Sequence, residues 1–316
     1  MSARKLKTAA KAAWHGVFRA MQRAGINVLP RHFYSAIPDL AELERRSDWR
    51  RPRSLHGIAL QDVAEQLTLL GQWLVPQQDF LRGRTVHEAA IAGGGSDSGY
   101  GEIEADVLFG FVATCRPKRV VQVGCGVSTA VMLSAAEHAA YRPDVICIEP
   151  FPSVYLKDAE KRGALRLLAE PAQSVGLETM TSLGEGDLLF VDSTHAVKPG
   201  SEVNFLIHEV LPRLSAGTWV HFHDVYFPYD YARDTLSGDL WFPQETALLY
   251  AFLTGNTGYR LEASLSMIHY GDPEGLRRLL PRYRPGAQTD GLGVRGDGGH
   301  FPSAIYLRVV DRRIAP

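Results

Sequence analysis

The chain has 316 residues, of which 45% are hydrophobic and 22% charged, and its formal net charge is −1. These values are ordinary for a globular protein. No run of 18 apolar residues occurs and the first residues lack a continuous apolar core, so we expect neither a transmembrane helix nor a secretory signal peptide. The three cysteines (Cys115, Cys125, Cys147) form no CxxC pair. We therefore expect a reduced compartment, the cytoplasm, and no zinc site.

The charge is unevenly spread along the chain. Residues 1–57 carry a net charge of +8 and the remainder −9, a pattern that indicates an anionic partner. Residues 1–24 predict a basic amphipathic helix, and no acidic residue precedes Asp39. Such a helix binds a membrane surface or a nucleic acid, or it packs on its own domain or on a partner subunit with its lysines in solvent. The packing interpretation is the plainer one, and it leaves an oligomer open.

The segments that follow lead toward a sheet. Residues 30–57 contain three prolines and predict irregular structure, whereas the apolar spacing of residues 58–82 predicts a helix. The glycine-rich segment 92–101 is a loop that closes over a ligand or simply connects. Residues 102–116 predict a helix that leads into the first strand. We expect an N-terminal helical extension over 1–97 and the main domain over 98–316.

The most informative segment begins at residue 119. The β-branched run Val120–Val123 predicts a buried parallel strand, Gly124 and Gly126 break it, and Ser128 stands where a helix N-cap belongs. A strand, a tight glycine turn and a helix N-terminus bring backbone N–H groups against a ligand. This pattern indicates a nucleotide-type cofactor.

The residues around this turn select among cofactors. The third glycine of a dinucleotide fingerprint is replaced by Thr129, and no phosphate-binding P-loop occurs. The next predicted strand ends in Glu149, 25 residues after Gly124. A carboxylate at that place can accept two hydrogen bonds from a ribose diol. The combination suits S-adenosylmethionine better than a dinucleotide.

The remainder of the chain alternates predicted strands and helices. Five strands end near Gly124, Glu149, Glu170, Asp192 and His223, a spacing that predicts βα units in a parallel, doubly wound sheet. Later strands are expected around 259–270 and 304–310, separated by the glycine-rich loop 286–299. Ligands bind at the carboxyl ends of such strands. There the sequence gathers Gly124, Gly126, Ser128, Glu149, Gln173, Asp192, His195, His223 and Asp224.

These acidic and imidazole side chains leave several roles open. Asp192 contacts the cofactor, holds a metal, holds a base or caps a turn, and His195 is a general base or a surface histidine. Asp192, His223 and Asp224 form a site for Mg²⁺ or another divalent cation, or a base with its orienting carboxylate and no metal. The aromatic segment 226–231 lines an acceptor pocket or anchors a loop.

The segment 241–246 follows shortly afterwards and also concerns the pocket. Its aromatic residues add to the pocket wall. Glu245 within it complements a helix dipole.

Four segments carry a resemblance to a known family. They read QVGCGVST (122–129), IEP (148–150), FVDSTH (190–195) and HFHDVYFPYDY (221–231). They resemble class I S-adenosylmethionine-dependent methyltransferases, in particular the branch often found beside sugar and polysaccharide biosynthesis enzymes. The resemblance covers roughly residues 98–312, and HFYSAIP (32–38) is similar to a segment that precedes the catalytic domain in that branch.

The resemblance implies a Rossmann-like α/β fold, a seven-stranded sheet of order 3-2-1-4-5-7-6 with strand 7 antiparallel. It implies adenine contact near Gln173 and Ser174, and Asp192 and Asp224 match metal ligands of related O-methyltransferases. Gln122 departs from the acid common at its position. The expected cofactor-binding set is Gln122, Gly124, Gly126, Ser128, Thr129, Glu149, Gln173 and Asp192.

The leading hypothesis is O-methylation of a small-molecule or glycan acceptor from S-adenosylmethionine. His195 or His223 takes the acceptor proton, and Asp224 orients the base or helps hold a cation. Gln122 supports an alternative, a non-catalytic cofactor-binding or scaffold protein. A nucleic-acid methyltransferase ranks last, because no base-methylation motif and no interleaved basic and aromatic patch occur.

Overall fold

The structure, a computed structural model, describes residues 3–94, 99–232, 241–286 and 299–311, with side chains from residue 11 onward. The central parts of the two glycine-rich loops, 95–98 and 287–298, lie outside the described residues. The chain divides into an N-terminal unit, Met1–Arg45, and a sheet unit, Arg46–Pro316. No helix in the described part is long and apolar enough to cross a membrane.

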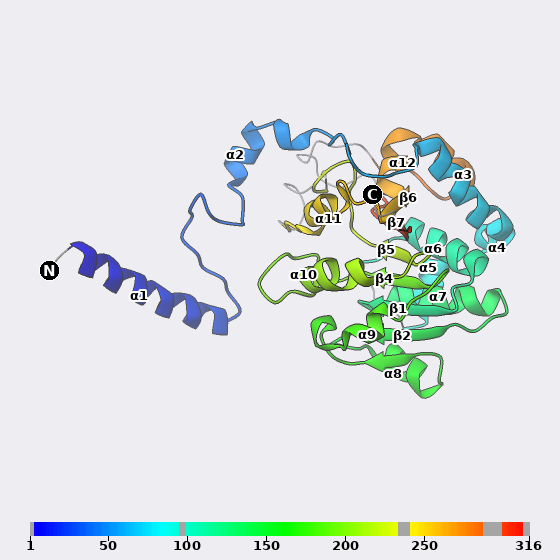
Figure 1. Ribbon diagram of the computed structural model, residues 1–316, viewed down its shortest axis with the longest axis horizontal. Helices are drawn as coiled ribbons and strands as arrows, with labels where there is room; N and C mark the ends of the chain where they lie inside the picture. The colour runs from blue at the N-terminus through cyan, green and yellow to red at the C-terminus, as the bar shows by residue number, and fades with distance from the viewer. Residues whose placement is uncertain (1–2, 95–98, 233–240, 287–298, 312–316) are drawn as a thin grey trace. The chain divides into compact units, whose positions relative to one another are not determined.

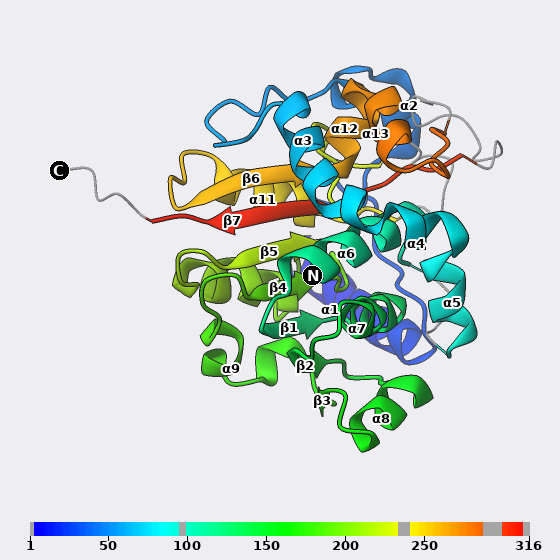
Figure 2. The ribbon, with the colours of Figure 1, turned by 90° about the vertical axis from the view of Figure 1, so that its right-hand side faces the viewer.

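Within the described residues the sheet unit contains one seven-stranded sheet of order β3-β2-β1-β4-β5-β7-β6 (Figure 1). β7 is antiparallel to both of its neighbours, and the other neighbouring pairs are parallel. Figure 2 shows the sheet extending from β3 at one edge to β6 at the other. The predicted fold and strand order are thereby confirmed. The strands are β1 (Arg119–Val123), β2 (Asp144–Ile148), β3 (Arg166–Leu168), β4 (Leu188–Val191), β5 (Trp219–Phe222), β6 (Tyr259–Ser264) and β7 (Ile305–Val309).

The sheet is buried on both faces, and its strands divide their side chains between two apolar cores. In β4, Leu188 and Phe190 belong to one core and Leu189 and Val191 to the other, because successive side chains of a strand point to opposite faces. Helices cover both faces, as a parallel sheet requires. This explains why the inner strands are nearly uninterrupted apolar runs.

The helices begin and end at recognisable signals. Asp62 forms a capping box with Glu65 at the start of α3, and Ser153 caps α8. The helices of the sheet unit are α3 (Val63–Leu74), α4 (Gln78–Gly83), α5 (Val86–Ala92), α6 (Glu102–Cys115), α7 (Val127–His138), α8 (Val154–Lys161), α9 (Leu177–Thr181), α10 (Glu202–Phe205), α11 (Glu245–Leu253), α12 (Leu265–Gly271) and α13 (Pro273–Leu279). The N-terminal unit contains α1 (Ala3–Arg23) and α2 (Leu40–Arg45).

The structure places the segment before residue 97 differently from the sequence expectation. Helix α3 contacts α6 and β6, and its Leu70, Trp73 and Leu74 are buried in the core of the sheet unit. Residues 46–94 thus belong to the sheet unit, whereas 1–45 form the separate unit. The division into an N-terminal extension over 1–97 and a main domain over 98–316 stays a prediction.

Three local expectations differ from the structure. Ser128 lies inside the first turn of α7 and Gly126 is the N-cap, because the Ser128 hydroxyl is engaged by the Gln122 amide. The segment expected as one strand over 259–270 is β6 followed by α12, since the Ser264 side chain caps that helix. Helix α2 interrupts the irregular segment 30–57.

The tight passage between β1 and β4 yields a stability prediction. Gly124 has φ +77°, and a Cβ there would lie 1.6 Å from the Asp192 carbonyl oxygen. Gly124→Ala should therefore cost about 2–5 kcal/mol of unfolding free energy, through left-handed strain and overpacking together. Gly186 has φ +82° with nothing within 4 Å of an added Cβ, so Gly186→Ala should cost only about 1–2 kcal/mol. Urea denaturation measures both variants, and equal losses would contradict the close-approach explanation.

Candidate active site

The ends of the five parallel strands β1 to β5 are fixed against one another by backbone hydrogen bonds. The N–H of Gly124 donates to the Ile148 carbonyl (3.1 Å), and the N–H of Asp192 donates to the Val123 carbonyl (2.9 Å). The N–H groups of Glu149 and His223 extend the sheet in the same way, to Leu168 and Val191. Each residue that follows a strand is therefore held in register with its neighbour, and their side chains gather at one edge.

A cavity of about 280 Å³ opens at this edge, over the ends of β1, β2 and β4. Gly124, Glu149, Gln173 and Asp192 of the predicted cofactor-binding set line it. Phe151, which is 88% exposed, also borders the cavity and was not predicted. The cavity thus combines apolar surface with a few polar groups, as small-molecule sites do.

The Glu149 carboxylate has a fixed orientation at the cavity. Its Oε2 accepts the Cys125 N–H (3.2 Å) and its Oε1 accepts the Phe151 N–H (2.9 Å). Each carboxylate oxygen can accept a further hydrogen bond, so Glu149 retains acceptor capacity for a ligand. Gln173, which also lines the cavity, donates its amide to the Gly200 carbonyl (3.0 Å).

The other predicted cofactor residues support the glycine turn from within. The buried Gln122 amide donates to the Gly124 carbonyl and to the Ser128 hydroxyl, and it accepts from the Thr129 hydroxyl. The Gly126 N–H donates to the Thr129 hydroxyl oxygen (3.2 Å). The cavity lining includes none of Gln122, Gly126, Ser128 and Thr129. The neutral Gln122 amide forms hydrogen bonds with the turn. A charged side chain at this buried position would form them only at a desolvation cost.

Two histidines and two aspartates form a compact cluster beside the cavity. Asp192 Oδ1 lies 3.4 Å from both His195 Nε2 and His223 Nδ1. Asp224 Oδ2 lies 3.8 Å from the former nitrogen and 3.7 Å from the latter. The structure thus brings all four predicted residues together, although 32 residues separate Asp192 from Asp224 in the chain.

Two buried glutamates, which the sequence analysis did not assign to the site, complete this cluster. Glu245 is fully buried, and its Oε2 lies 2.7 Å from His195 Nδ1. Glu104 Oε1 lies 4.0 Å from His223 Nε2 and accepts the Ser303 N–H (2.9 Å). The sequence did offer one signal that Glu245 is buried, because Glu245 shares a helix face with the apolar Leu249.

The clustered charges determine the ionisation of the two histidines. Burial lowers the pKa of His223, but Asp192 and Asp224 outweigh this and raise it to about 9. Burial opposes the rise at His195 as well, yet hydrogen bonds to Asp192 and Glu245 hold its pKa well above the usual range. Burial would raise the pKa of Asp192, but the His223 and His195 charges lower it. The cluster therefore holds positive charge among carboxylates at neutral pH.

The backbone at the cluster is also strained. His195 and Asp224 have φ of +56° and +53°, in the left-handed region that side chains rarely adopt. Such conformations cost on the order of 1–3 kcal/mol each and persist where the surroundings impose them. The His195 carbonyl accepts the Gln244 and Glu245 N–H groups, which fastens its turn to the start of α11.

The aromatic residues after β5 mostly anchor their loop. Tyr226 and Phe227 are buried, Tyr226 stacks on Phe301, and Asp230 forms an ion pair with Arg53. None of the residues 226–231 lines the described cavity. Trp241, by contrast, packs its edge against the His195 ring, with centroids 5.5 Å apart, and is 44% exposed. Trp241 therefore borders the cluster, and so does the buried Tyr100, whose ring centroid lies 4.8 Å from that of His223.

Comparison with known proteins agrees with this geometry. Residues 121–225 match the family model described as a methyltransferase domain. An uncharacterized protein of Archaeoglobus fulgidus is 27% identical over 168 residues, which cover 49% of this chain and 73% of that protein.

Solved structures were compared as well. A methyltransferase of Podospora anserina, PaMTH1, bound to S-adenosylhomocysteine is 16% identical with a TM-score of 0.39, over 90% of this chain and 100% of that one. The plantazolicin methyltransferase BamL is 13% identical with a TM-score of 0.41, over 79% and 97%.

The family match and the sheet order agree on the class of this domain. The sheet order with an antiparallel β7 is that of class I methyltransferases, and the matched residues span β1 to the end of β5, where the cavity and the cluster lie. Residues 121–225 therefore carry a methyltransferase domain, in a sheet with the class I strand order.

The ionisation of His223 can be tested directly. Asp192→Asn should lower the His223 pKa from about 9 by about one to three units, because the nearest carboxylate charge is lost. Since the raised pKa stabilises the folded state below pH 6.5, the stability that Asp192 contributes through His223 should fade as pH rises through about 9. Histidine NMR titration in chelator-treated protein measures the shift. The pKa of His269, which burial lowers to about 4, is the internal control, and an unchanged His223 pKa would contradict the assignment.

Proposed function

We propose that the protein transfers the methyl group of S-adenosylmethionine to a hydroxyl oxygen of a small-molecule or glycan acceptor. The observation that carries the proposal is the His195–His223 pair held between Asp192 and Asp224 beside the cofactor cavity. A hydroxyl must lose its proton as it attacks carbon, whereas a neutral amine is already nucleophilic. A dedicated cluster for proton transfer therefore favours an oxygen acceptor.

The cavity supports a definite placement of the cofactor. Glu149 would accept hydrogen bonds from the ribose hydroxyls, and Gln173 and Phe151 would border the adenine. The bare backbone at Gly124 would face the amino acid part of the cofactor, beside Asp192. When bound, S-adenosylmethionine supplies an electrophilic methyl group. The residues of the edge need only orient it toward the histidine cluster.

Within the cluster, Glu245 would act as a positioning residue. It accepts the Nδ1 proton of His195, which directs Nε2 toward Asp192 and Asp224. This arrangement of an imidazole between a buried carboxylate and a reacting group is suited to proton transfer. Protonated histidines cannot accept a proton, so a metal-free base would gain activity as pH rises through the histidine pKa values.

The residues of the cluster also fit a divalent cation. Ligand atoms of Asp192, His195 and His223 lie within 4.8 Å of one another, and both ring nitrogens of the buried His223 lack a hydrogen-bond partner among the described residues. His195 joins Asp192 and His223 in this group, while Asp224, whose Oδ2 lies 3.7 Å from His223 Nδ1, stays a predicted ligand. Two imidazoles and one carboxylate favour Mn²⁺, Zn²⁺ or a similar ion over Mg²⁺. When bound, such an ion would lower the pKa of the acceptor hydroxyl.

The alternative functions have less support. A binding-only protein was suggested by Gln122, but this side chain supports the turn through its own hydrogen bonds and leaves the cavity lining intact. A nucleic-acid acceptor gains no support from the cavity, whose lining contains no Lys or Arg. A glycan acceptor, of the kind found in sugar biosynthesis, stays a proposal.

Cofactor placement is tested at Glu149. Glu149→Gln should weaken the affinity for S-adenosylhomocysteine by about 10- to 100-fold, because charge-assisted hydrogen bonds contribute about 1.5–3 kcal/mol. Glu137→Gln removes the same charge from an exposed position of α7 and is the matched control. Isothermal titration calorimetry gives both dissociation constants. Equal affinities for the two variants would exclude Glu149 as the ribose ligand.

The role of the cluster is tested with separate measurements. His223→Gln should slow methyl transfer to a panel of phenols, catechols and monosaccharides by about 10²- to 10⁴-fold with unchanged cofactor affinity. Mn²⁺ titration of chelator-treated protein should show binding that is lost in Asp192→Asn and kept in the exposed control Asp79→Asn. Transfer to matched amines but not to hydroxyls would refute oxygen methylation. Full activity in the chelator would refute the cation.

A further inference from the structure

We propose that the N-terminal unit, Met1–Arg45, binds the surface of an anionic lipid membrane. The proposal concerns this unit alone and is independent of the methylation chemistry. It rests on the combination of unpaired positive charge and exposed apolar side chains in one short unit. Interfacial amphipathic helices combine the same two features, with cationic residues on the polar face and tryptophan, phenylalanine or leucine on the other.

The charge of the unit has one sign over most of its length. Eight Lys or Arg residues and three acidic residues give it a net charge of +5, and all three acids follow residue 38. Lys11, Arg19 and Arg23 of α1 are exposed, and none of them forms an ion pair within the described part of the chain. These cations are available to an external anionic surface.

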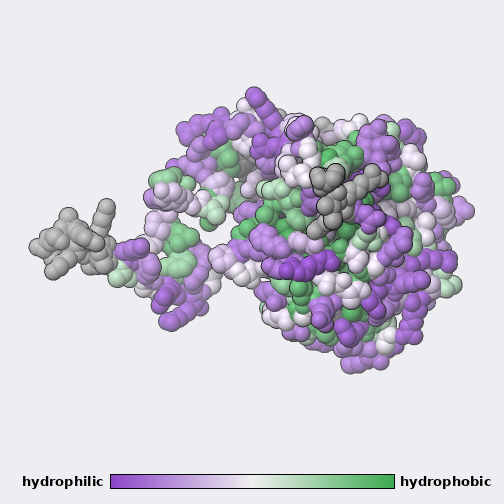
Figure 3. Space-filling view, viewed as in Figure 1, coloured by the Kyte–Doolittle hydropathy of each residue, from purple (hydrophilic) through white to green (hydrophobic). Residues whose placement is uncertain are grey.

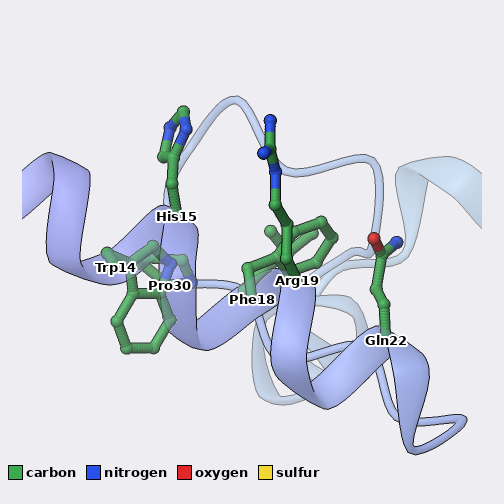
Figure 4. A pocket seen from close by; sticks show the side chains of 7 residues that line it. Trp14, His15, Phe18, Arg19, Gln22 and Pro30 are labelled. Atoms are coloured by element: carbon green, nitrogen blue, oxygen red, sulfur yellow. The ribbon is translucent and has the colours of Figure 1, made fainter.

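The apolar side of α1 is equally distinctive. Trp14, Phe18 and Met21 follow at helical spacing, and Figure 4 shows Trp14 on the side of α1 away from His15 and Arg19. With Leu29 and Pro30, the first two residues line a groove of about 420 Å³. The indole nitrogen of Trp14 is buried without a hydrogen-bond partner among the described residues. At a lipid interface an indole N–H commonly finds such a partner among the headgroups.

The segment after α1 adds a second apolar element. Phe33 and Tyr34 are 83% and 80% exposed, and their rings form a group with the His32 ring. Ile26 and Ile37 are also exposed, at 50% and 61%. Hydrophobic and hydrophilic groups adjoin one another over this unit in the space-filling view (Figure 3). An exposed apolar set of this extent marks an interaction surface.

The chemistry of the unit favours a lipid surface over two other partners. A second copy would place two like charges of +5 against each other, which opposes association through this unit. A nucleic acid would satisfy the cations but would leave exposed aliphatic residues such as Ile26 and Ile37 without contact. An anionic bilayer offers headgroup charge and an apolar layer together.

The test is vesicle flotation with the full chain. We expect binding to vesicles of phosphatidylcholine with 30% phosphatidylglycerol, weak binding to phosphatidylcholine alone, and release by 0.5 M salt. Lys11→Glu/Arg19→Glu/Arg23→Glu should weaken the partition coefficient by about 100-fold or more, because each basic residue near the surface contributes about fivefold. The control Lys118→Glu/Lys157→Glu/Arg166→Glu reverses three exposed charges of the sheet unit and should bind as the wild type does.

A second variant separates the contribution of the apolar side chains to membrane binding from that of the charges. Trp14→Ala/Phe33→Ala should also weaken binding while leaving S-adenosylhomocysteine affinity unchanged, which shows that the sheet unit is folded. Absence of flotation with anionic vesicles would overturn the proposal. So would equal loss in the control variant, salt-insensitive binding, tighter binding to a generic RNA than to vesicles, or a dimer that the Trp14→Ala/Phe33→Ala variant dissociates.

Discussion

The close approach of β1 and β4 is the constraint on which the site depends. The chain leaves β1 at Gly124 so near to the Asp192 carbonyl that no side chain fits between them. This contact lets the end of β1 lie in register with both β2 and β4. Glu149 and Asp192 consequently stand on either side of one bare backbone turn. A larger residue at 124 would separate the carboxylate of the cavity from the histidine cluster.

The second feature of the edge is its excess of carboxylates. Glu104, Asp192, Asp224 and Glu245 surround His195 and His223, and the pKa values of both imidazoles are raised as a result. Burial raises the pKa of Glu104 and Glu245, partly against the effect of their histidine partners. A group of buried and half-buried acids that retains protons on histidine offers the same electrostatic environment to a divalent cation. Proton transfer and cation binding are thus two uses of one charge distribution.

Much of the fold could be predicted from short signals in the sequence. The β-branched run Val120–Val123 and the apolar Leu188–Val191 stand out because strands buried on both faces are uninterrupted apolar runs. The strand order, however, followed from the resemblance to a family and not from spacing. The end of β6 was missed because a single hydroxyl, that of Ser264, starts a helix where the apolar pattern continues.

The site was predictable where its residues follow strands directly. Asp192, His223 and Asp224 do so, and the sheet brings them together. Glu245 and Glu104 come from helices, so their contacts with histidines 50 and 119 residues away in the chain depend on tertiary packing that no local pattern encodes. The inward role of Gln122 was hidden for a similar reason, because its partners Ser128 and Thr129 meet it only after the turn has formed.

A crystal structure of the wild-type protein with S-adenosylhomocysteine tests the central claim most directly. We expect both ribose hydroxyls within hydrogen-bonding distance of the Glu149 carboxylate, the amino acid part over the Gly124 turn, and the sulfur directed toward Asp192 and the histidine cluster. A ligand bound away from the carboxyl ends of β1, β2 and β4, or with its ribose turned away from Glu149, would contradict this interpretation of the site.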